Sequence, residues 1–95
     1  MSETVGVHVV IEGRVQGVGF RCFTREHAQK LHLTGWVRNT FDGNVEAYAE
    51  GLQADLNIWL NQLQQGPGSA FVTHITKEWT TPTQKFRNFQ IGPTG

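Results

Sequence analysis

The stretch GRVQGVGFR, residues 13–21, combines residue types that could hold a phosphate group. Gly13, Gly17 and Gly19 permit backbone conformations closed to other residues and let a ligand approach the chain closely. Successive backbone N–H groups that lead into a helix N-terminus can converge on an anion. Arg21 adds a fork of donors that could bind a phosphate through two hydrogen bonds. The stretch therefore predicts a site for a single phosphate, with a glycine-rich turn shaped only by sterics as the alternative.

Three known phosphate motifs do not match this stretch. A Walker loop that begins at Gly13 would need glycine where Val18 stands. A dinucleotide fingerprint that begins at Gly17 would need glycine or alanine where Cys22 stands. A phosphatase of the Cys-x5-Arg type would need arginine in place of Ala28. The predicted phosphate site is therefore of another kind.

Together with GWVRNTFDGNVE, residues 35–46, the stretch resembles the acylphosphatases, small enzymes that hydrolyse carboxyl-phosphate anhydrides. A looser similarity extends over residues 5–92. The resemblance implies two catalytic residues: Arg21, which binds the substrate phosphate, and Asn39, which holds the attacking water. It also implies a phosphate-binding loop made of Val15, Gln16, Gly17, Val18, Gly19 and Phe20.

Acyl phosphate chemistry needs few catalytic groups. The leaving carboxylate has a conjugate acid with a pKa of about 4, so it departs without a general acid. Phosphoryl transfer passes through a loose transition state, so positioning and electrostatic stabilisation carry most of the catalysis. The N–H groups of residues 15–20 and Arg21 could supply that stabilisation, while Asn39 aims the water. We expect no metal and no cofactor, and we expect inorganic phosphate to be both product and competitive ligand. A phosphate oxygen as acceptor of the water's proton is a further hypothesis that the resemblance implies.

The remaining polar residues favour structural roles. Cys22 could be a nucleophile at the helix N-terminus, but an unreactive free thiol is the simpler interpretation. Arg38 alternates with Asn39 along a strand, so it should face the other way. No metal-ligand spacing relates the four histidines, His8, His27, His32 and His74.

Hydrophobic periodicity predicts the order of the elements. Alternation over residues 5–12 indicates a strand, and a helix should run from Phe20 to near His32. Two strands follow around the hairpin signal Asp42-Gly43. A second helix has its apolar positions between Leu52 and Leu63 and is stopped by Gly66-Pro67. Residues 71–79 form another strand with a bulge, and residues 89–91 a last short one. We predict an α+β, ferredoxin-like β-α-β-β-α-β sandwich over residues 1–95, with two helices on one face of an antiparallel sheet and an extra short C-terminal strand.

Composition limits the classes of partner. Eight basic and eight acidic residues cancel, which argues against nonspecific binding to nucleic acids or membranes. One cysteine allows no internal disulfide, no apolar run approaches a membrane span, and the N-terminus MSETVGVH lacks a signal-peptide layout. We therefore expect a soluble, cytoplasmic monomer that acts on a small-molecule acyl phosphate, without a nucleic-acid or membrane partner.

Two binding functions compete with the enzyme. An RNA-recognition domain has the same element order, but Glu46 and Glu50 flank Tyr48 on the strand that would face RNA and would repel phosphates. An acylphosphatase-like domain retained for binding, or for carbamoyl-phosphate chemistry in a larger assembly, stays open as an alternative.

Overall fold

The computed structural model describes residues 3–95, and the sequence predicts the order of its elements. They are β1 (Thr4–Arg14), α1 (Phe20–Lys30), β2 (Thr34–Asn39), β3 (Val45–Leu52), α2 (Gln53–Gln65), β4 (Phe71–Thr80) and β5 (Phe89–Ile91). The N-terminal stretch MSETVGVH, for which no signal peptide is predicted, begins with two residues that lie outside the described residues. Neither helix in the described range has the length and apolar character that a bilayer crossing requires.

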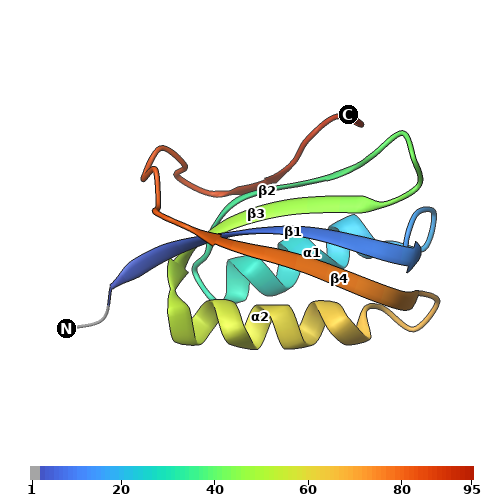
Figure 1. The fold of residues 1–95 in the computed structure, drawn as a ribbon, viewed down its shortest axis with the longest axis horizontal. Coiled ribbons are helices and arrows are strands. Elements are labelled where there is room, and N and C mark those ends of the chain that lie inside the picture. The colour runs from blue at the N-terminus through green and yellow to red at the C-terminus, as the bar shows by residue number, and fades with distance from the viewer. Residues whose placement is uncertain (1–2) are drawn as a thin grey trace.

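The five strands form one sheet in the order β4-β1-β3-β2-β5 (Figure 1). Neighbours among β1, β2, β3 and β4 are antiparallel, as the ferredoxin-like prediction requires. The predicted extra C-terminal strand is β5, which runs parallel to β2 and pairs Gly35 with Phe89. The sheet is therefore mixed, because the chain crosses the sheet after β4 and enters β5 from the same end as β2.

A β-bulge interrupts the pairing of β1 with β4, as the broken alternation of β4 predicts. Glu12 pairs with His74 but Gly13 pairs with Val72, so Thr73 is the extra residue of β4. Gly13 has φ 128°, a conformation that favours glycine. A bulge bends its strand and increases the local twist, so this one bends β4 beside the end of β1, where the following loop begins.

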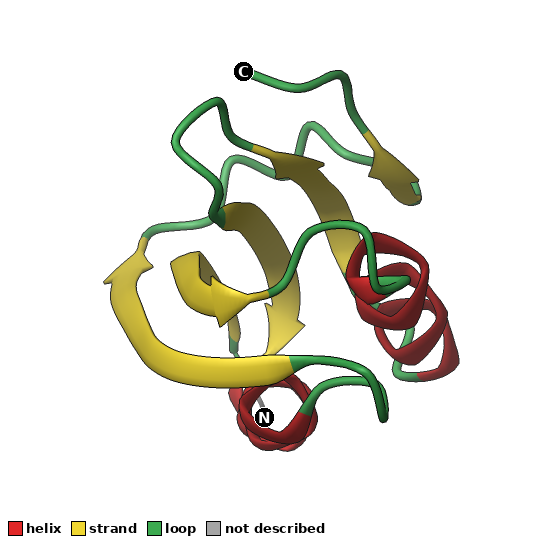
Figure 2. Ribbon diagram, turned by 90° about the vertical axis from the view of Figure 1, so that its right-hand side faces the viewer, coloured by secondary structure: helices red, strands yellow, loops and turns green. Residues whose placement is uncertain are grey.

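The core lies between the helices and one face of the sheet (Figure 2). Trp59 of α2 is fully buried, packs edge-on against Phe89 at 5.8 Å between ring centroids, and donates its Nε1–H to the Thr24 carbonyl at 3.2 Å. Burying one large apolar side chain contributes about 1.5–3 kcal/mol. The inward residues of the central strands alternate as predicted, and they are Val7, Val9, Ile11, Val45, Ala47 and Ala49.

On the opposite face of the sheet, the buried carboxylate of Glu50 holds the chain that follows β4. Glu50 is 3% exposed and accepts hydrogen bonds from the Tyr48 hydroxyl at 2.5 Å, the Thr83 N–H at 2.5 Å and the Gln84 N–H at 3.0 Å. Burial raises the pKa of Glu50, but these donors outweigh burial, and its pKa lies below the usual value. The negative charge of Glu50 therefore stabilises the folded position of residues 83–84.

Candidate active site

Strand topology brings the two predicted functional segments to one edge of the sheet. Both β1 and β2 pair antiparallel with β3, so they run in the same direction and their last residues, Arg14 and Asn39, lie at the same edge. The loop after β1 and the turn between β2 and β3 accordingly lie together at one end of the molecule, on the right in Figure 1. Arg21 follows from the same loop, since α1 begins at Phe20.

A cavity of about 180 Å³ opens at this end of the molecule. One water occupies a share of about 30 Å³ in the liquid, so the cavity has room for a phosphate-sized group together with a water. Arg21 and Asn39 both line it, although they come from different elements. The lining residues are Val15, Gly17, Gly19, Phe20, Arg21, Cys22, Asn39 and Ile91.

The loop that forms one wall has an unusual backbone conformation. Gly17 has φ 73° and Gly19 has φ 79°, both in the left-handed region. A Cβ atom added at either glycine would meet nothing within 4 Å, so the loop requires glycine for its backbone angles rather than for space. Across residues 3–95, no backbone N–H of residues 16–20 donates to another backbone group, and the first bond of α1 runs from the Phe23 N–H to the Gly19 carbonyl at 3.0 Å. A row of N–H donors at a helix N-terminus is thus available to an anion.

The electrostatics of the cavity favour a negative ligand. Arg21 is half-buried, and within the described part of the chain no carboxylate forms a salt bridge with it. No acidic residue occupies the first turn of α1, and none lines the cavity. The positive end of the α1 dipole and the guanidinium therefore act on the same space without a competing anion.

Asn39 lines the cavity and carries a buried hydrogen-bond acceptor that has no partner among the described residues. Its side-chain Oδ1 is buried and accepts no hydrogen bond from any residue between 3 and 95. A buried acceptor without a partner costs about 1–3 kcal/mol, so such atoms are retained where a ligand or water uses them. The backbone carbonyl of Asn39, by contrast, is engaged by the Gly95 N–H at 3.0 Å.

Two predicted loop residues do not line the cavity. The side chain of Gln16 is directed to the turn after β2, where its Nε2 donates to the carbonyls of Thr40 at 2.7 Å and Asn44 at 2.8 Å. Val18 is half-buried and packs against the core. Only the backbone of these two residues is available for the predicted phosphate contacts.

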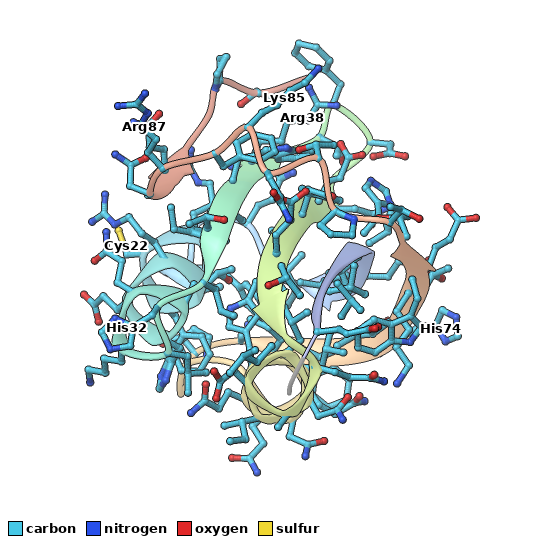
Figure 3. The ribbon with its side chains drawn as sticks, turned by 90° about the vertical axis from the view of Figure 1, so that its left-hand side faces the viewer. Cys22, His32, Arg38, His74, Lys85 and Arg87 are labelled. Carbon is cyan, nitrogen blue, oxygen red and sulfur yellow. The ribbon has the colours of Figure 1, made fainter. Side chains whose placement is uncertain are left out.

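Cys22 and Ile91 also line the cavity, although neither is among the site residues predicted from the sequence. Cys22 is a free, exposed thiol, and Figure 3 shows it at the outer surface of the molecule. Ile91 reaches the site because β5 pairs beside β2. The position of Cys22 directly after Arg21 could have indicated its proximity, but no local signal predicts the parallel pairing that places Ile91 there.

No metal site accompanies the cavity among residues 3–95, where no three His, Cys, Asp or Glu residues are grouped to bind an ion. His32 and His74 lie on opposite sides of the molecule in Figure 3.

Arg38 lies on the other face of β2, as its alternation with Asn39 predicts. Its Nε donates to Glu46 at 2.8 Å, and its guanidinium lies 5.2 Å from the centre of the Trp36 ring. Burial raises the pKa of Glu46, but hydrogen bonds from His8 and Arg38 outweigh it, so the pKa of Glu46 lies below its usual value. The arginine next to Asn39 in the sequence therefore belongs to an ion pair away from the cavity.

Known proteins share this fold and much of this sequence. The acylphosphatase family model matches residues 7–91. An acylphosphatase of Bacillus licheniformis is 46% identical over 83 residues, which cover 87% of this chain and 92% of that protein. The crystal structure of an acylphosphatase from Bacillus subtilis matches with a TM-score of 0.90 at 35% identity, over 93% of this chain and 98% of that one. Full-length HypF in its phosphate- and nucleotide-bound form matches with a TM-score of 0.89 at 26% identity, over 99% of this chain but 12% of that one.

Proposed function

Since this chain belongs to the acylphosphatase family and is an acyl phosphate hydrolase, we propose that a water held by Asn39 attacks phosphorus held by residues 15–20 and Arg21. The water oxygen forms a bond to phosphorus, and the bond from phosphorus to the acyl oxygen breaks. The products are a carboxylate and inorganic phosphate. The observation that carries the proposal is the meeting of Arg21 and Asn39, from α1 and β2, in one cavity beside a loop with available N–H donors.

Phosphate binding is assigned to the loop backbone and to Arg21. Backbone donors fixed before the substrate arrives need little reorganisation when charge develops on the equatorial oxygens. Arg21 has no carboxylate partner within residues 3–95, so it is free to bind two phosphate oxygens at once. Val15, Phe20 and Ile91 bound the cavity with apolar surface, which limits competing water and strengthens these interactions.

Water positioning is assigned to Asn39. Its unpartnered Oδ1 can accept a hydrogen bond from a water and so direct that water's lone pair at phosphorus. A neutral amide cannot remove a proton at pH 7, so the proton of the water passes to a phosphate oxygen. The carboxylate leaves as an anion of low basicity and needs no acid.

The proposal also covers the domain organisation, the oligomeric state, the cofactors and the compartment. We propose that residues 1–95 act as one domain, as a monomer, without a metal or a cofactor. The free thiol of Cys22 is suited to a reducing compartment such as the cytoplasm. This chain matches only a small part of HypF. An alternative function therefore stays open, in which such a domain contributes to a larger assembly.

Hydrolysis of benzoyl phosphate, measured with and without EDTA, tests the proposed metal-independent turnover. We expect turnover in both conditions, and activity that disappears in EDTA and returns with zinc or magnesium would contradict it. Arg25→Ala provides the matched control for Arg21→Ala, because it removes the same charge from the same helix at a residue that does not line the cavity. We expect the control to keep its rate while Arg21→Ala loses both phosphate affinity and turnover. Activity that appears only with an added partner protein would favour the assembly alternative.

A further inference from the structure

The side chain of Gln16 joins the phosphate-binding loop to the turn that follows Asn39. Its single Nε2 donates two hydrogen bonds, 2.7 Å to the Thr40 carbonyl and 2.8 Å to the Asn44 carbonyl. These carbonyls belong to the first residue after β2 and the last residue before β3. Both N–H donors of the amide are therefore used on the turn and none on the cavity.

The turn does not need Gln16 for its own closure. The Thr40 N–H donates to the Asn44 carbonyl at 2.9 Å, and the Asn44 N–H donates to the Thr40 hydroxyl at 3.0 Å. The same hydroxyl donates to the carboxylate of Asp42. Since the turn is closed by its own hydrogen bonds, those from Gln16 add a connection between two separate segments.

This connection fixes the geometry that the proposed reaction requires. The neighbours of Gln16 in the loop, Val15 and Gly17, line the cavity, and so does Asn39, which directly precedes Thr40. A shift of the turn relative to the loop would change the distance between the water at Asn39 and the phosphorus. A displacement of about 1 Å can cost on the order of 10²-fold in rate.

We infer that Gln16 is a positioning residue that holds Asn39 at the attack distance from the bound phosphate. The inference rests on the proposed function of Asn39. It separates the two tasks of the loop, because the backbone of residues 15–20 binds the phosphate while the Gln16 side chain positions the residue that holds the water. A merely structural glutamine would affect stability, whereas a positioning glutamine affects kcat through Asn39.

The test is a double-mutant cycle of Gln16→Met and Asn39→Ala, with kcat on benzoyl phosphate and the inhibition constant of inorganic phosphate as readouts. Methionine matches glutamine in length but has no N–H donor. We expect Gln16→Met to lower kcat by about 10- to 100-fold and to change the phosphate inhibition constant by less than about threefold. In the Asn39→Ala background, we expect the same change to lower kcat by less than about twofold, because no positioned water remains to be lost.

Four results would overturn the inference. Equal losses in both backgrounds would show that Gln16 acts independently of Asn39. A phosphate affinity that falls in proportion to kcat would make Gln16 a support of the loop alone. Normal turnover by Asn39→Ala would refute the proposed function itself, and the role of Gln16 with it, so the two failures are distinguishable. Gln16→Glu is the second variant, and it places an acceptor opposite the two carbonyls. We expect it to lower kcat at least as much as Gln16→Met does. A kcat of Gln16→Glu near that of the unmodified protein would also contradict the inference.

Discussion

Replacing Gly17 with alanine isolates the energetic cost of the loop conformation. Gly17 has φ 73°, and a Cβ atom added there would meet nothing within 4 Å. Steric clash with the rest of the protein therefore contributes nothing, and the cost comes from the left-handed backbone alone. For a residue with a Cβ, that conformation costs roughly 1–2 kcal/mol.

Gly68→Ala is the matched control. A Cβ atom added at Gly68 also meets nothing within 4 Å, but Gly68 has no left-handed φ. At either position, alanine restricts the unfolded chain, and this contribution of about 0.4–1 kcal/mol in favour of folding is the same for both variants. The difference in free energy of unfolding between the two variants should therefore equal the left-handed cost of about 1–2 kcal/mol. For a domain of this size, each kcal/mol lowers Tm by about 4–8 °C.

Urea denaturation of both variants, with and without inorganic phosphate, measures this difference. We expect Gly17→Asn to recover much of the loss, because asparagine tolerates the left-handed region. If residue 17 changes its φ in Gly17→Ala to relieve the strain, the phosphate-binding loop is distorted. Phosphate should then stabilise Gly17→Ala less than it stabilises Gly68→Ala. Equal unfolding free energies for Gly17→Ala and Gly68→Ala would refute the conformational argument for the loop.

Three further outcomes follow from the site and the sheet. Cys22→Ser should keep kcat within about twofold, because the proposed nucleophile is water; a folded but inactive variant would implicate the thiol. Inorganic phosphate should compete with the substrate and raise Tm, with a stabilisation of about 2.7 kcal/mol at 100 times its Kd, and a Tm unchanged by phosphate would contradict the loop assignment. The pKa of Glu50 is held below its usual value, so its charge contributes stability that is complete above the unfolded pKa and is lost as pH falls through the folded pKa. Glu50→Gln should therefore lower Tm at pH 7 and flatten the decline of Tm between pH 6 and pH 3, whereas parallel Tm curves would contradict this account.

Local patterns in the sequence predict most of the fold. Strand alternation, helical periodicity and the Asp42-Gly43 turn depend on neighbouring residues, and the structure has the elements they indicate. The bulge in β4 was predictable for the same reason, because a break in alternation marks it. The parallel pairing of β5 with β2 depends on where a long connection leads the chain, and the short segment at residues 89–91 carries no signal for it.

The candidate site also has parts that the sequence predicts and parts that it does not. The glycine-rich loop and Arg21 are continuous in sequence, and Asn39 follows from a second motif, so all could be predicted to lie together. The side-chain contacts of Gln16 could not, because its acceptors are backbone carbonyls 24 and 28 residues further along the chain. The position of Ile91 at the cavity could not be predicted either, because it depends on the register of β5 beside β2.

The most direct test of the account compares Asn39→Ala with Arg21→Ala by calorimetric phosphate titration and steady-state kinetics. Asn39 should contact only the attacking water, so Asn39→Ala should bind phosphate almost normally while kcat falls by on the order of 10²-fold or more. Arg21 should contact the phosphate in both ground and transition states, so Arg21→Ala should lose affinity and turnover together. Normal turnover by Asn39→Ala, or unchanged phosphate affinity in Arg21→Ala, would contradict the division of roles between these two side chains.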